Sequence, residues 1–242
     1  MGLPRVNETL NFTMTIPSSG KKVKYRPYLV KEEKILLQAF ESQDTVTCLQ
    51  AMCDTIAMCL DEKEKVDTME LATFDIEYMF TQLRSRSVGE TSTIVVRCKN
   101  DECGQANEVE IDLESLSVDT SGIETIIKLN DEVSVELQYP TYKNLLSGKL
   151  PTESKDQQNM EDILLLIANS IVSVRTENEH IDCREQSTKE IMSFLESMTA
   201  SQLQSVATFF ENLPVLSKDI EFVCKECKTH NELELKGLSD FF

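Results

Sequence analysis

One pattern that decides the fold occurs twice in the chain. It reads TIVVRCKNDECGQANEVEID from Thr93 to Asp112 and DIEFVCKECKTHNELELK from Asp219 to Lys236. In each copy an apolar run precedes a pair of cysteines, and the return segment is Asn-Glu-aliphatic-Glu-aliphatic. Alternation of apolar and polar residues is typical of strands. Each copy therefore predicts a strand, a cysteine turn and a second strand.

Four cysteines from these turns, Cys98, Cys103, Cys224 and Cys227, predict one metal site. A Cys-x4-Cys or Cys-x2-Cys hairpin, similar to a rubredoxin knuckle, directs only two sulfurs at one point, so a tetrahedral set needs two facing hairpins. Four thiolates leave no open coordination position, which predicts a structural rather than a catalytic site. We expect Zn²⁺; iron or an iron-sulfur cluster is the alternative, because thiolates suit both metals.

Other residues could replace one of these ligands. His230 is the rival fourth ligand, and Cys183 with His180 is a weaker alternative, but neither lies inside a repeated turn. Basic residues cluster on both turns: Arg97, Lys99, Lys225 and Lys228. We expect them to offset the net charge of about −2 that four thiolates leave on a divalent ion.

The remaining cysteines share no ligand-like spacing. Cys48, Cys53 and Cys59 fall on a predicted helix over Thr45 to Leu60. We interpret these three, and Cys183, as small buried hydrophobic residues, since free cysteine is among the most buried residue types. In a reducing compartment all eight cysteines are expected to stay thiols or to bind metal.

The composition is that of a folded, acidic protein. Hydrophobic residues make up 40% and charged residues 27% of the chain, and the formal net charge is -18. This charge repels phosphates, so nucleic-acid binding is not expected. The longest apolar stretch, Ile163 to Ala168, is too short to span a bilayer, and Met1 to Leu10 lacks the layout of a signal peptide. We therefore expect a protein made and used in a cytoplasm or in a particle assembled there.

Patterns along the chain predict an α+β fold in three parts. Residues 1–90 form an N-terminal β-hairpin and helical region. Its expected elements are strands at Phe12 to Ile16 and Val23 to Arg26, helices at Val30 to Phe40 and Thr45 to Leu60, and a third helix opened by the capping pair Asp67 and Glu70. Residues 91–118 together with 218–242 form a discontinuous tetrathiolate module, a zinc-ribbon-like pair of cysteine-knuckle hairpins.

Residues 119–217 are predicted to be a mainly helical middle region. Its expected elements are a strand at Val133 to Leu137, an exposed loop at Pro151 to Gln158, an apolar helix with Ile163, Leu166, Ile167 and Ile171 on one face, and two helices opened by the capping boxes Ser187-x-x-Glu190 and Thr199-x-x-Gln202.

The sequence carries no motif of an enzyme. His180 and His230, which are the two histidines of the chain, stand in no nucleophile or HExxH arrangement, and no Gly-rich phosphate loop is present. Pairs of acidic residues are so common in this chain that they indicate only a solvated surface. We therefore predict that the protein is not an enzyme, and a thiol- or metal-dependent enzyme is the minority alternative.

Four segments together resemble a known family. They are GKKVKYRPYLVKEEK from Gly20 to Lys34, FDIEYMF from Phe74 to Phe80 running on to LRSRSVGE from Leu83 to Glu90, the two cysteine turns, and GLSDFF from Gly237 to Phe242. In these segments the chain is similar to the baseplate hub proteins of T-even-type, contractile-tailed bacteriophages, a family that includes hub subunits and a hub assembly protein. The resemblance spans nearly the whole chain.

The resemblance implies a structural component of the tail baseplate hub that takes part in tail tip assembly. Its implied partners are other baseplate hub and tail proteins, with a homo-oligomer also compatible. The implied location is the virion tail baseplate, after synthesis in the bacterial host cytoplasm. It brings no catalytic residues with it, and it leaves open a transient hub assembly chaperone that is absent from the mature virion.

Two further features suggest contacts with partners. The basic segment Lys21 to Arg26 is a local exception in an acidic chain and is either a solvated hairpin or a docking strand for an acidic partner. The terminal pair Phe241-Phe242 either folds back on the core or inserts into a neighbouring protein, and we favour the neighbour.

Overall fold

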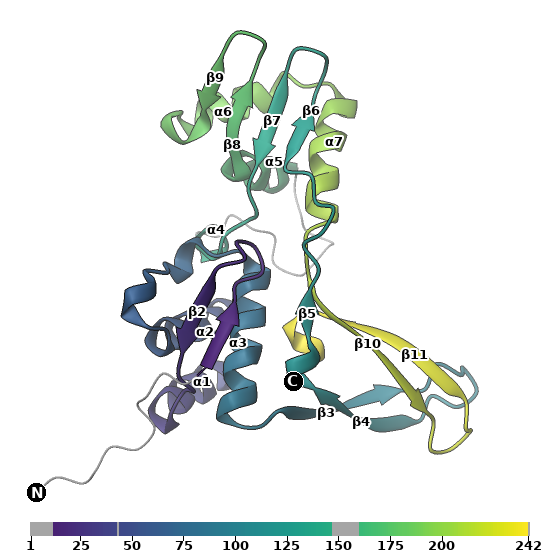
Figure 1. Cartoon of the computed structure of the whole chain (residues 1–242). Helices are drawn as coiled ribbons and strands as arrows, with labels where there is room; N and C mark the ends of the chain where they lie inside the picture. Colours follow the sequence, from purple (N-terminus) through teal and green to yellow (C-terminus); the bar gives the residue numbers. More distant parts are fainter. Residues whose placement is uncertain (1–11, 43, 147–159, 242) are drawn as a thin grey trace, which may run out of the picture. The chain divides into compact units, whose positions relative to one another are not determined.

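The computed structural model describes residues 12–42, 44–146 and 160–241 and has the predicted α+β fold. Its contacts divide the chain into two compact units (Figure 1). The first unit contains Met1–Asp119 and Pro214–Phe242, and the second contains Thr120–Leu213. The second unit is therefore an insertion between two halves of the first. The predicted three-part division of the chain stays a prediction.

The N-terminal part of the first unit follows the predicted order of elements. They are β1 (Phe12–Thr15), β2 (Lys22–Tyr25), α1 (Val30–Glu41), α2 (Thr45–Cys59), the short 3-10 helices η1 (Glu62–Glu64) and η2 (Thr68–Glu70), and α3 (Thr73–Ser87). Strands β1 and β2 are antiparallel, with Phe12 opposite Tyr25. Helix α1 buries Glu32, Leu36 and Ala39, which recur at the spacing of one helix face.

The predicted start of the third helix was wrong. Asp67 accepts a hydrogen bond of 3.0 Å from the Met69 backbone N–H and so caps η2. Helix α3 begins at Thr73, where the buried Asp75 carboxylate accepts hydrogen bonds from the backbone N–H groups of Ala72 (3.2 Å) and Ser18 (2.9 Å). Because Ser18 belongs to the turn between β1 and β2, the true cap depends on a contact from a distant segment.

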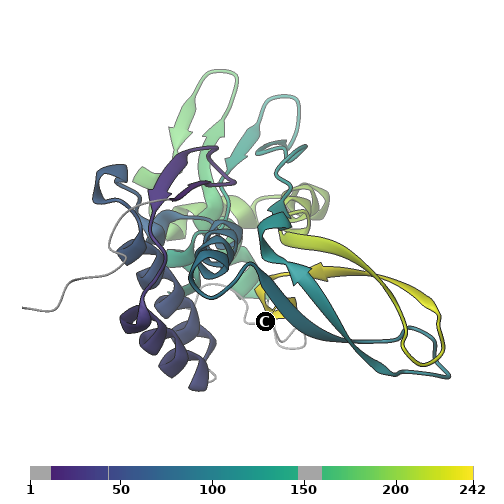
Figure 2. The same cartoon turned by 60° about the horizontal axis from the view of Figure 1, so that its bottom comes forward.

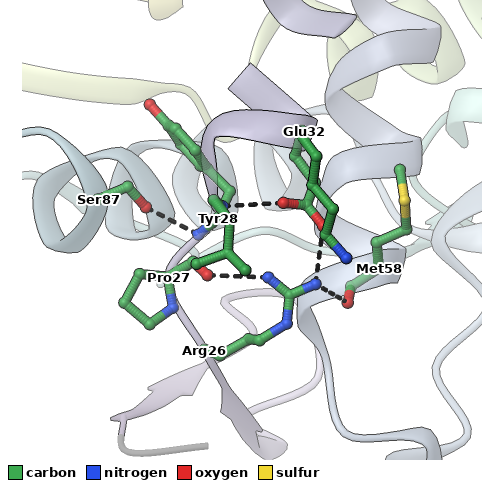
Figure 3. Close-up of polar contacts among 8 residues, drawn as sticks. Arg26, Pro27, Tyr28, Glu32, Met58 and Ser87 are labelled. Carbon is green, nitrogen blue, oxygen red and sulfur yellow. Dashed lines mark hydrogen bonds and ion pairs between the residues drawn. The ribbon is translucent and has the colours of Figure 1, made fainter. Parts of the chain in front are cut away.

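An ion pair between the partly buried Arg26 and the buried Glu32 holds the segment Arg26 to Glu32 in place (Figure 3). The Arg26 guanidinium donates to the Glu32 carboxylate at 2.8 Å and to the Met58 carbonyl at 3.0 Å. The other Glu32 oxygen accepts from the Leu29 N–H at 2.9 Å, and Glu32 is 1% exposed. Burial raises the pKa of Glu32, but these hydrogen bonds outweigh it and hold the pKa below its ordinary value. This segment therefore connects β2, α1 and the end of α2.

In the basic segment Lys21 to Arg26, predicted to be either a solvated hairpin or a docking strand, the side chains of Lys21 and Arg26 have acidic partners within the unit. The Lys21 ammonium lies 3.9 Å from the Glu64 carboxylate, and the Lys24 backbone N–H donates to the same carboxylate at 3.4 Å. The Arg26 guanidinium forms an ion pair with the Glu32 carboxylate. These contacts favour the solvated hairpin over the docking strand.

The repeated sequence forms two antiparallel hairpins, each followed by a 3-10 turn. The elements are β3 (Thr91–Arg97), β4 (Ala106–Asp112) and η3 (Leu113–Ser115), then β10 (Leu216–Val223), β11 (His230–Lys236) and η6 (Leu238–Asp240). Strands β4 and β11 share the same alternation of buried and exposed positions. The short β5 (Ser117–Val118) pairs with β10, so the chain leaves and re-enters this unit at neighbouring points.

One core joins the two hairpins. Buried apolar side chains from both repeats meet in it: Ile94, Ile111, Leu113, Leu116, Leu216, Ile220, Leu235 and Phe241. Phe241 is 0% exposed, and its carbonyl accepts a hydrogen bond of 2.8 Å from the Ser92 hydroxyl. The expectation that Phe241 inserts into a neighbour is therefore wrong, because the side chain completes the core of its own unit. Phe242 lies outside the described residues.

The second unit combines helices with a sheet. Its elements are β6 (Ile126–Lys128), β7 (Ser134–Leu137), α4 (Tyr142–Leu146), α5 (Met160–Ser170), β8 (Ile171–Arg175), β9 (His180–Asp182), η5 (Cys183–Glu185), α6 (Thr188–Glu196) and α7 (Ala200–Glu211). The sheet is antiparallel in the order β6-β7-β8-β9. The capping boxes at Ser187 and Thr199 are confirmed. The predicted loop over Pro151 to Gln158 lies outside the described residues.

The sequence patterns indicated only β7 of this sheet. Ile171 was predicted on the apolar face of a helix, but α5 ends at Ser170 and Ile171 opens β8. The run from Ile171 to Val174 contains three β-branched residues, which favour strands, and Leu137 of β7 lies opposite Ile171. In the described residues no helix is both long and apolar enough to cross a bilayer.

Candidate metal centre

Each cysteine turn is closed by its own backbone hydrogen bonds. In the first, the Cys98 N–H donates to the Gln105 carbonyl at 2.9 Å, and the Asn100 carbonyl accepts from the N–H groups of Cys103 (2.9 Å) and Gly104 (3.0 Å). Gly104 has a φ of +55°. This left-handed conformation favours glycine, so the residue after the second cysteine lets the chain turn back into β4.

The second turn reaches a similar geometry with a shorter loop. The Cys224 N–H donates to the Thr229 carbonyl at 2.9 Å, and the Cys224 carbonyl accepts from the Lys228 N–H at 3.1 Å. Lys228, which also follows the second cysteine of its pair, has a φ of 57°. Both turns therefore use a left-handed residue directly after the second cysteine.

The structure brings together the four sulfurs that the sequence singled out. Cys98 Sγ lies 3.6 Å from Cys227 Sγ, and Cys103 Sγ lies 3.8 Å from Cys224 Sγ. All four sulfurs lie within 4.8 Å of one another. Tetrahedral zinc with Zn–S bonds of about 2.3 Å separates its sulfurs by about 3.8 Å. The residues therefore fit a tetrathiolate ion, and Figures 1 and 2 show the tips of the two hairpins meeting at this point.

Two asparagines that the sequence analysis did not single out hold the turns against each other. The Asn107 side chain accepts the Lys225 backbone N–H at 2.8 Å, and the Asn231 side chain accepts the Lys99 backbone N–H at 2.8 Å. Each asparagine is 2% exposed. Each also donates at 2.8 Å to a carbonyl of its own turn, Asn107 to Gln105 and Asn231 to Thr229. The two hairpins therefore exchange equivalent hydrogen bonds across the site.

The signal for these asparagines was present in the repeat. Each is the fourth residue after the second cysteine of its turn. The repetition was read only as a strand pattern, since nothing in one sequence shows that an asparagine points at the other hairpin.

Basic side chains of the turns also reach the opposite hairpin, where they contact oxygen atoms of glutamate residues. The Lys99 ammonium donates to the Glu232 carbonyl, and the Lys225 ammonium lies 4.0 Å from the Glu108 carboxylate. Lys228 donates to the Lys225 carbonyl at 2.7 Å. The first two contacts connect equivalent positions of opposite repeats. These side chains thus add to the contact between the hairpins as well as to the local positive charge.

Hydrogen bonds and crowding act in opposite directions on the thiols. The Thr229 hydroxyl and backbone N–H lower the pKa of Cys227 to about 6, and the Cys227 backbone N–H lowers the pKa of Cys224. The backbone N–H of Gln105 lowers the pKa of Cys103, but partial burial and the adjacent sulfurs outweigh it and raise this pKa to about 11. Four adjacent thiolates therefore need a cation to be charged together near neutral pH.

The rival ligands lie elsewhere. His230 Nε2 is 3.5 Å from Glu221 and its Nδ1 is 3.9 Å from Glu232, and in the described part of the chain the potential metal-binding group contains only the four cysteines. Cys183, which opens η5 directly after the strand that begins with His180, is buried in the core of the second unit.

The three cysteines of α2 take part in packing. Cys53 and Cys59 are 0% exposed, and burial raises the pKa of their thiols to about 12 and about 11. The partly buried Cys48 donates to the Ala39 carbonyl at 3.3 Å. Neutral, apolar packing is the role expected of buried thiols.

A comparison with protein families gives the context of this geometry. Residues 9–242 match the family described as T4 bacteriophage base plate protein. The chain belongs to this family. No curated protein and no solved structure matches the chain. The match covers both repeated hairpins and the inserted unit.

Membership in the T4 base plate family confirms the resemblance seen in the sequence at the level of a T4-type baseplate protein. It supports a structural role in a phage tail baseplate, with other phage tail proteins as partners, rather than a catalytic role. The closed set of four thiols agrees with this, since catalytic zinc sites keep a position open for water or substrate.

Proposed function

We propose that this T4-type baseplate protein is a structural component of the baseplate hub that takes part in tail tip assembly through protein-protein contacts. We also propose that one Zn²⁺ bound by Cys98, Cys103, Cys224 and Cys227 stabilises it. The family match over residues 9–242 supports the baseplate role, and the four sulfurs within 4.8 Å of one another support the metal centre.

The location of the sulfurs explains what a metal would contribute. Two ligands come from the hairpin before the inserted unit and two from the hairpin after it. An ion bound to all four would join the two halves of the first unit. The asparagine exchange and the shared core act on the same two hairpins, so the metal would add to an existing contact.

Mass spectrometry of purified mature particles tests the hub role. A hub component is expected in the particles at a fixed ratio to the other tail proteins. Absence from particles that contain the rest of the baseplate would contradict a hub component and would favour the transient assembly chaperone.

Elemental analysis of the purified chain tests the metal centre. We expect about one zinc per chain, as one ion takes four thiolates. A visible absorption from thiolate-to-iron charge transfer would identify iron instead. Cys227→Ser is expected to lose the metal, whereas the matched control Cys48→Ser should retain it, because Cys48 only donates to a backbone carbonyl. A metal-free wild-type chain of undiminished stability would rule the centre out.

A further inference from the structure

Two close sulfur contacts run between the hairpins. Cys98 pairs with Cys227 at 3.6 Å and Cys103 with Cys224 at 3.8 Å. We propose that peroxide converts the four thiols into two disulfides between the hairpins, Cys98–Cys227 and Cys103–Cys224, so that the hairpins stay joined after the metal has left. The inference rests on the proposed metal centre for the starting state.

Exposure selects the first thiol to react. Cys227 is exposed, whereas Cys98 is 5% and Cys224 0% exposed. Oxidation requires an accessible thiolate. Peroxide therefore reaches Cys227 before the two buried sulfurs, and Cys98, whose sulfur lies 3.6 Å from that of Cys227, is placed to trap the oxidised sulfur.

The reaction is a balanced two-electron oxidation for each disulfide. The Cys227 thiolate attacks one oxygen of hydrogen peroxide, which breaks the O–O bond, and a sulfenic acid and hydroxide are formed. The Cys98 thiolate then attacks the sulfenic sulfur, forming the S–S bond and releasing the sulfenic oxygen as hydroxide. Each hydroxide takes up one proton to become water. Loss of two of its four thiolates would release a bound ion, and a second peroxide oxidises Cys103 and Cys224 in the same way to the second disulfide.

The network around the site favours this pairing. The hydrogen bonds of Asn107 to Lys225 N–H and of Asn231 to Lys99 N–H contain no sulfur and no metal. They keep the two turns opposed while the ion leaves. A disulfide needs its sulfurs at about 2.05 Å, a small approach from 3.6 Å by side-chain rotation. The two proposed disulfides share no cysteine, so both can form in one chain.

The main competitor is a disulfide within the shorter turn. Cys224 and Cys227 have the Cys-x-x-Cys spacing, which forms disulfides in redox proteins. Such a bond would leave the two hairpins unconnected. The pattern of disulfides therefore shows whether oxidation keeps the two hairpins joined or leaves them unconnected.

The proposed disulfides suit a protein that changes compartment. Thiols stay reduced in a cytoplasm, and disulfides persist outside it. A baseplate protein leaves its host with the particle. The metal would join the hairpins during assembly in the cell, and the disulfides would join them in oxidising surroundings.

Peptide mapping of the full-length chain tests the proposal. Purified protein, with its zinc content measured first, is treated with increasing hydrogen peroxide, blocked with an alkylating reagent and digested without reductant. We expect cross-linked peptides joining Cys98 to Cys227 and Cys103 to Cys224, appearing together with zinc release to a chromophoric chelator. The buried Cys53 and Cys59 are internal controls and should remain reduced. At low peroxide, a sulfenic-acid probe should label Cys227 before the other three.

Other results would overturn the proposal. Disulfides within the turns, or sulfinic acids without any disulfide, would refute the pairing while a measured zinc content left the metal centre intact. Pairs between the hairpins in a chain purified without metal would support the pairing and refute the metal centre instead. Wild-type protein suffices for both readouts, so neither depends on a variant that folds.

Discussion

Replacing Asn231 with alanine gives a direct test of how the two hairpins are held together. Asn231 is 2% exposed, accepts the Lys99 N–H at 2.8 Å and donates to the Thr229 carbonyl at 2.8 Å. Alanine removes both hydrogen bonds. The Lys99 N–H of the first turn then loses its acceptor, whereas the Thr229 carbonyl of the second turn still accepts from the Cys224 N–H at 2.9 Å. We therefore expect the first turn to open more often while both strands stay paired.

The magnitude follows from the one bond that joins the two turns. A buried hydrogen bond contributes about 1 kcal/mol net, and an unpaired buried partner costs somewhat more. The opening free energy of the first turn should thus fall by about 1–2 kcal/mol. With tenfold for each 1.4 kcal/mol, the hydrogen-exchange protection of the Lys99 amide should fall by about 5- to 30-fold. Loss of such an outer contact also lowers metal affinity by about 10- to 100-fold.

Residue-resolved amide hydrogen exchange by NMR measures this effect, and a zinc competition titration measures the affinity. Asn107→Ala is the reciprocal variant and should act first on the Lys225 amide. Asn100→Ala is the matched control, because its partly buried side chain accepts only the Glu102 N–H at 3.0 Å. Unchanged exchange at Lys99 in Asn231→Ala, or an equal change in the control, would refute the reasoning.

Three further perturbations test other parts of the first unit. Cys227→Ser should lose the bound metal and lower the melting temperature, measured by elemental analysis and circular dichroism; equal metal content in wild type and variant would contradict this. Glu32→Gln should cost about 3 kcal/mol in chemical denaturation, because the partly buried Arg26 keeps its charge but loses its carboxylate partner. Glu41→Gln at the exposed end of α1 should cost little. Since the pKa of Glu32 is lowered in the fold, its stabilisation is present above its ordinary pKa and is lost as pH falls through the lowered value; a variant with the same acid stability curve as wild type would refute this. Phe241→Ala should lower the free energy of unfolding by about 3–5 kcal/mol, because the ring is 0% exposed. Val95, which is 68% exposed, is the control. A loss no larger than that of Val95→Ala would show that the ring does not stabilise the core.

Much of the fold was readable from short stretches of sequence. The alternation around Ile94 and Ile220 predicted both hairpins, and the helix predicted over Val30 to Phe40 is α1. The capping boxes at Ser187 and Thr199 lie within four residues of sequence each. These signals are local, because hydrogen bonds and side-chain periodicity within one element decide them.

Errors arose where a distant partner decides the structure. Asp75 rather than Asp67 caps α3, because Ser18 from the β1–β2 turn shares its carboxylate. Ile171 begins a strand because Leu137 of β7 lies opposite it. The sequence around a helix or strand end does not show which distant segment will pack against it. The start of α3 and the start of β8 therefore could not be predicted from the neighbouring residues alone.

For the candidate metal centre, the sequence by itself determined the four thiols and their arrangement as two turns, since the spacing within each pair fixes a knuckle. Only the tertiary structure decided that Cys98 faces Cys227 and Cys103 faces Cys224. It also decided that Asn107 and Asn231 exchange hydrogen bonds between the hairpins. The physical reason is that the inserted unit separates the two turns along the chain, and tertiary contacts, the shared core around Phe241 and the asparagine hydrogen bonds, bring them together.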